Sequence, residues 1–193
     1  MTEPTGRRER KKAQTRKSLA DAALQLFLDR GYDQVGVKDV ADAADVSVTT
    51  LFKHFPCKEA LVFDEDDDVE AALVASVRQR PPDQSIPQAL RECVLAMGAR
   101  AADPRAAAFA RMVEDAPDLR AYAHRMWMRH EAAVARAIAE EVGAPEDDVT
   151  CAALARYALE ARSLTRGHAD PRRAAEEVFA LLDRGWAAVH PGH

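Results

Sequence analysis

Residues 37–61 read VKDVADAADVSVTTLFKHFPCKEAL, and this stretch contains two short helical patterns separated by a tight turn. In residues 37–44 the apolar positions recur at the spacing of one helix face, which predicts a first helix. Ser47 is a good N-cap for a second helix over residues 48–55, which a proline ends. Asp45, in the turn, tolerates the positive φ that a tight connection requires. Two helices joined in this way have the outline of a helix-turn-helix.

Helical spacing extends on both sides of this stretch. Residues 14–30 carry apolar side chains at intervals of three and four, which predicts an amphipathic helix, and Gly31 fits a left-handed cap at its end. A fourth helix is predicted from near Cys57 towards Arg80. Further helices, separated by proline or glycine, are expected at residues 86–102, 104–114, 117–142, 145–167 and 171–190. The fold class that follows is all-α, with about nine helices.

The composition agrees with a helical globular protein. The chain has 193 residues, of which 48% are hydrophobic and 31% are charged, so disorder is not expected. Aromatic residues make up 6%, and alanine, the best helix former, dominates. No run of 18 apolar residues is present, and no apolar segment follows the basic N-terminus as in a secretory signal. We therefore expect no membrane partner.

Positive charge is concentrated near the N-terminus. The formal net charge is −5, yet residues 1–60 hold 11 Lys/Arg against 9 Asp/Glu, a net +2. The remaining 133 residues hold 16 against 23, a net −7, and all six lysines lie in the first 58 residues. A basic end on an acidic body suggests contact with a polyanion, and a solvated basic tail is the alternative.

The cysteines and histidines do not predict a metal site or a disulfide. Cys57, Cys93 and Cys151 are odd in number, far apart and without a CxxC pair, which favours a reducing cytoplasm. His124 and His130 are six residues apart and therefore fall on different faces of a helix. The acidic run that follows the helix-turn-helix wraps around a helix, so a solvated face is preferred to an ion site. No cofactor is expected.

The second helix of the predicted helix-turn-helix has the composition of a DNA reader. Its outward positions are Ser47, Val48, Thr49, Thr50, Lys53 and His54, whereas Leu51 and Phe55 point to the core. Short hydroxyl and methyl groups at the N-terminal end of a helix fit a major groove, and a helix N-terminus favours a phosphate. A small, purely structural three-helix unit is the alternative.

Five sequence blocks between Arg10 and Leu61 stand out by their order and spacing. They are Ala22–Phe27, Gly31-Tyr32, Val37–Ala41, Ala44–Ser47 and Thr50–Leu61. Together they resemble the N-terminal domain of the TetR family of transcriptional repressors. The chain departs from the family pattern at five positions. Gly36 replaces the usual Thr or Ser cap, Asp45 the usual turn glycine, and Thr49 a frequent glycine or alanine. Phe52 replaces a frequent tyrosine, and Cys57 a usual serine.

The resemblance implies where DNA is contacted. The expected DNA-binding residues are Lys38, Ser47, Val48, Thr49, Thr50, Phe52, Lys53, His54 and Lys58. The hydroxyl residues and Lys53 are expected at bases or nearby phosphates. Phe52, His54 and Lys58 are expected beside the DNA backbone, with Arg10–Lys12 as weaker candidates. The expected partner is double-stranded, pseudo-palindromic operator DNA. Two helix-turn-helix domains would bind it, with their recognition helices about one helical turn or slightly more apart.

The resemblance also divides the chain. It implies a flexible basic arm at residues 1–12, a DNA-binding domain at 13–60 and a ligand-binding and dimerisation domain at 61–193. Apolar faces on the last two helices are expected to pair across a two-fold axis, making a homodimer through a four-helix bundle. The candidate interface residues are Leu154, Ala158, Ala161, Phe179, Leu182 and Trp186. An intramolecular core is the alternative for these faces.

Large, soft side chains in the middle of the chain suggest an adaptable apolar pocket. The candidates are Met97, Phe109, Met112, Met126, Trp127 and Tyr157. Taken singly, each also fits an ordinary core. Arg129, His130 and Arg162 are candidate polar anchors for a ligand.

The predicted function is that of a sequence-specific DNA-binding regulator in the cytoplasm, a repressor that a small-molecule effector releases from its operator. The first alternative is a helical-bundle enzyme, for which the sequence offers no Ser/His/Asp order, no phosphate-binding glycine loop and no ExxH repeat. The second is an adaptor that kept the fold without binding DNA.

Overall fold

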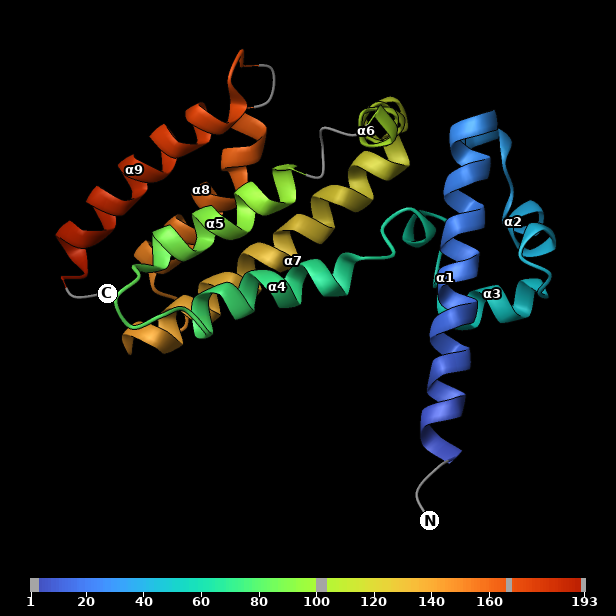
Figure 1. Cartoon of the computed structure of the whole chain (residues 1–193), viewed down its shortest axis with the longest axis horizontal. Helices are drawn as coiled ribbons and strands as arrows, with labels where there is room; N and C mark the ends of the chain where they lie inside the picture. Colours follow the sequence, from blue (N-terminus) through green and yellow to red (C-terminus); the bar gives the residue numbers. More distant parts are fainter. Residues whose placement is uncertain (1–3, 100–103, 166–167, 192–193) are drawn as a thin grey trace. The chain divides into compact units, whose positions relative to one another are not determined.

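The structure is a computed structural model that describes residues 4–99, 104–165 and 168–191. Within these residues the chain has nine α-helices, two short 3₁₀ helices and no strand, which confirms the predicted fold class (Figure 1). No helix in these ranges combines the length and apolar content that a membrane crossing requires. The chain divides into two compact units, each with its own hydrophobic core. The first is Met1–Glu65 with Ala107–Ala123, and the second is Asp66–Ala106 with His124–His193.

The first unit is built on the long helix α1. Its elements are α1, Pro4–Arg30; η1, Tyr32–Gln34; α2, Val37–Ala43; α3, Val48–His54; and η2, Glu59–Leu61. Figure 1 shows α2 and α3 along one side of α1. The predicted helix start at Gln14 is wrong, because residues 4–12, expected as a flexible arm, form the first turns of α1. Arginine, lysine and glutamate, all good helix formers, fill residues 7–12 and account for the extension.

Local hydrogen bonds and one unusual backbone angle position α2 and α3. Gly36 precedes α2, and its N–H donates to the Asp39 carboxylate at 2.7 Å. Asp45, between the helices, has a φ of 52° and is the one non-glycine residue at positive φ in the described ranges. Ser47 caps α3, since its Oγ accepts a hydrogen bond from the Thr50 N–H at 3.1 Å. The predicted helix-turn-helix is confirmed, with each helix one residue shorter than expected.

Apolar side chains from every element of the first unit form its core. The residues buried to 1% exposure or less are Leu19, Ala23, Phe27, Val35, Val40, Ala41, Leu51, Phe55, Leu61 and Leu119. Helix α6, Pro104–Asp115, and the first turns of α7, Pro117–Val142, contribute to the same unit. Phe63 stacks on Tyr122, with ring centroids 5.3 Å apart, and meets Phe109 edge-on at 6.0 Å.

The helix predicted to start near Cys57 is two elements in the structure, η2 and α4, Asp66–Arg78. Arg16 accounts for the interruption. Its guanidinium pairs with the Asp64 carboxylate at 2.7 Å and donates to the Asp64 carbonyl at 3.2 Å, a carbonyl that a continuous helix would use internally. Helix α4 then begins with three acidic residues in its first turn, where the helix dipole favours negative charge.

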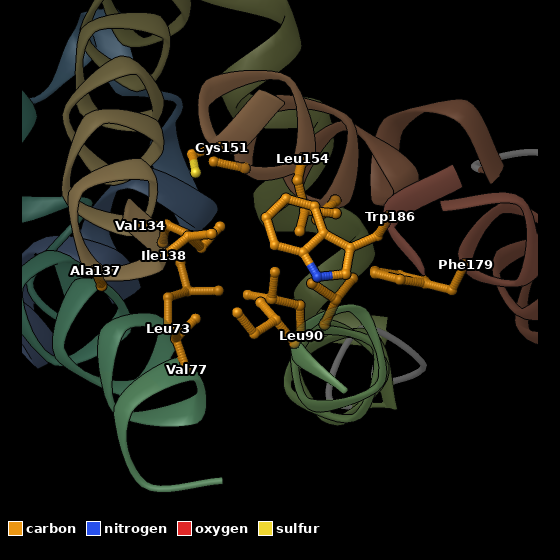
Figure 2. Close-up of a cluster of buried hydrophobic side chains, with 14 of the residues drawn as sticks. Leu73, Val77, Leu90, Val134, Ala137, Ile138, Cys151, Leu154, Phe179 and Trp186 are labelled. Atoms are coloured by element: carbon orange, nitrogen blue, oxygen red, sulfur yellow. The ribbon is translucent and has the colours of Figure 1, made fainter. Parts of the chain in front are cut away.

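The second unit is a bundle of longer helices. It contains α4, most of α7, α5, Ile86–Ala99; α8, Val149–Thr165; and α9, Pro171–Val189. Helices α8 and α9 pack on each other and on α5. Figure 2 shows the centre of this core, where Trp186 and Phe179 of α9 gather with Leu154 of α8 and Leu90 of α5.

The structure corrects the predicted dimer interface, because all six candidate residues belong to the core of a single chain. Leu154, Ala158, Ala161, Phe179 and Trp186 are each at most 4% exposed, and the partly buried Leu182 packs against them. The physical reason is that α8 and α9 turn these faces towards each other and towards α5. The large apolar side chains that remain exposed on α8 and α9, in the described residues, are Val149, Tyr157, Leu164, Leu181 and Val189.

Candidate DNA-binding surface

Helix α3 has one buried face and one exposed face. Leu51 is fully buried, as is Phe55 just past the end of the helix. Thr49 and Lys53, one turn apart, are both exposed on the other face. Within the part of the chain that the structure describes, neither side chain makes a hydrogen bond or an ion pair. Both are therefore available to a partner molecule.

The N-terminal end of α3 holds its hydroxyl groups in fixed positions. Besides the cap bond, the Ser47 and Thr50 hydroxyls lie 2.9 Å apart and hydrogen-bond to each other. Ser47 is exposed and Thr50 is half-buried. Val48 packs partly against the core of the first unit, so it is less available than Thr49. A ligand at this helix end would meet an ordered pair of hydroxyls.

Phe52 and His54 lie towards the other end of α3. The Phe52 side chain is 48% exposed. His54 is half-buried, and burial, followed by the positive charges of Lys12 and Arg16, lowers its pKa below the ordinary value. A neutral imidazole can donate a hydrogen bond to a phosphate without forming an ion pair. The His54 Nδ1 atom is buried and has no hydrogen-bond partner among the described residues.

Lys58, predicted as a phosphate contact, is tied into the first unit. Its Nζ donates to the Tyr32 carbonyl at 2.7 Å and lies 3.9 Å from the centre of the Tyr32 ring. Burial lowers the pKa of Lys58, although nearby carboxylates oppose the shift. The geometry favours a structural role, because contact with a phosphate would break the bond to the carbonyl.

Arg16 is a residue of this surface that sequence reasoning missed. In addition to its contacts with Asp64, Nη1 donates to the His54 carbonyl at 2.8 Å. The guanidinium carbon lies 4.4 Å from the centre of the Phe55 ring. Arg16 therefore anchors the C-terminal end of α3 to α1. The available signal was that Arg16 precedes Leu19 by three residues on an otherwise apolar helix face.

Other cations of the first unit are exposed. Lys38 on α2 pairs with Asp42 at 2.9 Å, and that hydrogen bond raises the pKa of the lysine. Such an i,i+4 surface pair contributes little to stability, so Lys38 is free to exchange partners. The first turns of α1 expose Arg7, Arg8, Arg10, Lys11 and Lys12. These side chains supply the positive charge that a phosphate backbone requires.

Of the six residues predicted to line a ligand pocket, two belong to the first unit and four to the second. Phe109 and Met112 pack against the core of the first unit, whereas Met97 and Trp127 pack against that of the second. Met126 is buried, and Tyr157 is 55% exposed on α8. An open surface hollow in the second unit is lined by charged and small apolar side chains of α4 and α7 and contains none of the six.

His130 is a fully buried polar side chain of the second unit. Its Nε2 lies 2.6 Å from Asp66 Oδ1, and Arg129 pairs with the other oxygen of that carboxylate. The ring meets Trp127 edge-on, with centroids 5.1 Å apart. The Nδ1 atom is buried without a hydrogen-bond partner in the described ranges. Leaving such an atom unpaired costs about 1–3 kcal/mol.

Comparison with known proteins supports the interpretation of α2 and α3 as a DNA-binding helix-turn-helix. A family model described as bacterial regulatory proteins of the tetR family matches residues 19–64. The match extends from the second half of α1 through α2, α3 and η2. The HTH-type transcriptional regulator TcmR of Streptomyces glaucescens is 32% identical over 151 residues, which cover 74% of this chain and 67% of TcmR.

Solved structures share the fold. The TetR family repressor AlkX from Dietzia sp. strain DQ12-45-1b, implicated in n-alkane biodegradation, has a TM-score of 0.62 at 21% identity and covers 90% of this chain and 98% of its own. Salmonella enterica GusR has a TM-score of 0.59 at 20% identity and covers 98% of both chains. At these identities the likeness shows the fold alone, whereas the match to TcmR covers two thirds of that regulator. With its helix-turn-helix and its helical second unit, the chain is a DNA-binding transcriptional regulator and belongs to the TetR family.

Proposed function

We propose that this protein represses transcription by placing α3 in the major groove of an operator. The observation that carries the proposal is the exposed pair Thr49 and Lys53, on a helix whose N-terminal end Ser47 caps. A threonine can contact a base edge or a thymine methyl group, and a lysine can contact guanine or a phosphate. Because both side chains lack partners in the described residues, binding DNA would break no contact of theirs.

The remaining contacts would position α3. Val48 and Thr50 lie beside the two exposed residues. Phe52 and His54 would contact the DNA backbone, and Lys38 and the cations at the start of α1 would neutralise phosphates. Lys58 is left out of the proposed contacts because its ammonium group is bound to the Tyr32 carbonyl. An operator is reached in the cytoplasm, a compartment that also fits the three free cysteines.

We further propose that two chains pair through the outer faces of α8 and α9. On α8, Tyr157 and Leu164 lie two turns apart and are 55% and 58% exposed. On α9, Leu181 is 65% exposed, and Gly185 and Ala188 follow on the same face. A Cβ added to Gly185 would meet no atom within 4 Å in the single chain. A mid-helix glycine costs about 1 kcal/mol, and close approach of a partner helix gives it a use.

A small molecule bound in the second unit would regulate the contact with DNA. The unpaired Nδ1 of His130, beside Trp127, supports an amphipathic effector that offers one hydrogen-bonding group and an apolar body. If the two binding events are coupled by about 1–3 kcal/mol, a saturating effector lowers operator affinity about 5- to 150-fold. Linkage requires the operator to weaken effector binding by the same factor.

Selection of bound sequences from random DNA tests operator recognition. With the selected site, we expect Lys53→Ala to weaken binding and to reduce the salt dependence by about one unit of slope. Arg172→Ala, which removes one positive charge from α9, is the matched control and should change neither. If the selection yields no preferred sequence, the chain is an adaptor with the family fold and the proposal fails.

Sedimentation tests the proposed dimer. Leu181→Glu places a charge on the outer face of α9 without touching the core, so it should yield a folded monomer. Met128→Glu, on an exposed methionine of α7, is the control and should remain dimeric. A dimeric Leu181→Glu variant would place the interface elsewhere.

Titration calorimetry tests regulation. Compounds that raise the melting temperature are titrated into the protein with and without the selected operator. We expect weaker effector binding in the presence of operator. Equal affinity in both titrations would show that the compound does not regulate DNA binding.

A further inference from the structure

Three side chains with metal-binding groups meet where α8 begins and α9 ends. Asp148 precedes α8, Cys151 lies in its first turn and His190 follows the last residue of α9. One ligand atom from each lies within 4.8 Å of the other two. The packing of α8 against α9 brings these positions together across about forty residues of sequence. The sequence predicted no metal site, because no short motif links the three.

Asp148 is held in place by its role as a helix cap. Its Oδ1 accepts hydrogen bonds from the N–H groups of Thr150 and Cys151, at 2.9 and 3.0 Å, and from the Thr150 hydroxyl at 2.6 Å. All three bonds use the same oxygen, and the Cys151 thiol also hydrogen-bonds to this carboxylate. A cation that replaces the thiol proton would therefore contact the carboxylate as well as the sulfur.

His190 is fixed from two sides. Its ring stacks on Trp186, with centroids 3.9 Å apart and planes 20° from parallel, and its Nε2 lies 2.7 Å from the Thr150 hydroxyl. Its backbone N–H donates to the Trp186 carbonyl at 2.8 Å and ends α9. Thr150 thus joins the carboxylate to the imidazole. Supporting bonds of this kind orient the ligands of metal sites.

The three side chains of the cluster differ in how deeply they are buried. Cys151 is 1% exposed, and Figure 2 shows its sulfur at the edge of the hydrophobic core. Asp148 and His190 are half-buried. A cation would enter past the carboxylate and the imidazole and meet the sulfur at the inner wall.

The geometry points to a site for Zn²⁺ or a similar divalent transition metal, held by Asp148, Cys151 and His190. Sulfur, nitrogen and oxygen donors suit zinc, whereas a thiolate is a poor ligand for magnesium or calcium. Zinc bonds of 2.0–2.3 Å imply about 3.3–3.8 Å between neighbouring ligand atoms in a tetrahedron, so these atoms need to approach one another by at most about 1.5 Å. A carboxylate, a thiolate and a divalent cation carry no net charge together. The bound ion would tie the start of α8 to the end of α9.

Cobalt titration of the metal-free, reduced chain tests the site. One equivalent of Co²⁺ should produce a thiolate-to-cobalt charge-transfer band, and Zn²⁺ should remove the band by displacement. Cys151→Ser should abolish it. Cys93→Ser, which removes a thiol elsewhere in the second unit, is the matched control and should retain it.

Two further variants keep the test decisive if Cys151→Ser does not fold. Asp148→Asn preserves the cap, because asparagine caps a helix as well as aspartate, yet removes the anionic ligand. His190→Gln removes the imidazole from a half-buried position. Each should weaken cobalt binding about tenfold or more and reduce the rise in melting temperature that zinc causes in the unmodified chain.

Three outcomes would overturn the inference. They are no charge-transfer band at saturating Co²⁺, a band that persists in Cys151→Ser, and unchanged cobalt affinity in both Asp148→Asn and His190→Gln. The inference does not depend on the proposed operator contacts, since the titration is made without DNA.

Discussion

The first unit and the second unit differ in the length of the helices that surround their cores, and polar contacts matter most where the helices are shortest. In the first unit, α2 and α3 have seven residues each, a length that is not stable as an isolated helix. In this unit, hydrogen bonds from polar side chains to buried groups add to the stability that the apolar core provides. In the second unit, α4, α5, α8 and α9 have 13 to 19 residues and meet through a large apolar core. Short helices need specific anchors, whereas long helices can rely on buried area.

Four residues form the polar anchors of the first unit. Arg16 fixes the end of α3, and Lys58 binds the Tyr32 carbonyl. The Tyr32 hydroxyl donates to Glu59 Oε1 at 3.1 Å. Burial, and then the charge of Glu59, raises the pKa of Tyr32, so this hydroxyl stays protonated. Removing one member of such a pair leaves the other buried group unsatisfied.

The second unit should be most sensitive to a cavity. Trp186→Ala removes the largest side chain of the core drawn in Figure 2, and we expect a loss of about 3–5 kcal/mol in the free energy of unfolding. Urea unfolding followed by circular dichroism measures it. The control is Met128→Ala, an exposed position that should cost less than about 0.5 kcal/mol. A loss below 1 kcal/mol for Trp186→Ala would contradict an apolar core centred there.

The first unit should be sensitive to removal of the single half-buried charge of Lys58. Lys58→Met keeps the aliphatic stem but leaves the Tyr32 carbonyl without its donor, which should cost about 1–3 kcal/mol. Lys53→Met is the matched control, since Lys53 is exposed, and should leave stability within about 0.5 kcal/mol while weakening operator binding. If the two variants lose stability equally, Lys58 is not an anchor.

The N-terminal end of α3 should show a smaller loss. Ser47→Ala removes the acceptor for the Thr50 N–H and should cost about 1 kcal/mol. Thr49→Ala, two positions along and without such a bond, provides the comparison and should change stability little. Thermal unfolding of both variants measures the difference. Equal melting temperatures would show that the Ser47 cap does not stabilise the first unit.

The smallest expected effect is a loss of stability at acidic pH through His54. The pKa of His54 is lower in the folded chain than the ordinary value of 6.5, because of burial and then Lys12 and Arg16. As the pH falls below 6.5, this imidazole therefore becomes protonated in the unfolded chain before it does in the folded chain. This contribution to stability is complete above that pH and is lost as the pH falls towards the folded pKa. His54→Gln should show a weaker loss of stability between pH 7 and 5.5, and an unchanged slope would refute the assignment.

The helix-turn-helix was predictable because its signals are local. The caps at Gly36 and Ser47, the turn residue Asp45 and the spacing of Val40 and Leu51 act within a few residues of one another. Ser47, Thr49 and Lys53 are exposed, as that periodicity predicted. Val48, Thr50 and His54, which were expected to point outward too, are half-buried. The helix start at Pro4 was missed because its residues are charged and show no buried face, although their helix propensity is high.

The partners of long-range polar groups were not predictable. Arg16 and Asp64 are 48 residues apart, and Lys58 and Tyr32 are 26 apart. No periodicity relates such positions. Because Lys58 lies near a DNA-binding helix, the sequence suggested a phosphate contact. In the structure its ammonium group instead contacts a carbonyl and an aromatic ring.

By itself, the sequence determined the helical class and the helix-turn-helix, because helix periodicity, caps and turn preferences operate over a few residues. Only the tertiary structure decided which apolar face of α8 and α9 is core and which remains exposed. It also decided that Asp148, Cys151 and His190 lie together. Amphipathic spacing shows that a helix buries a face but does not identify what covers it, because burial against the same chain and against a second chain gives the same pattern.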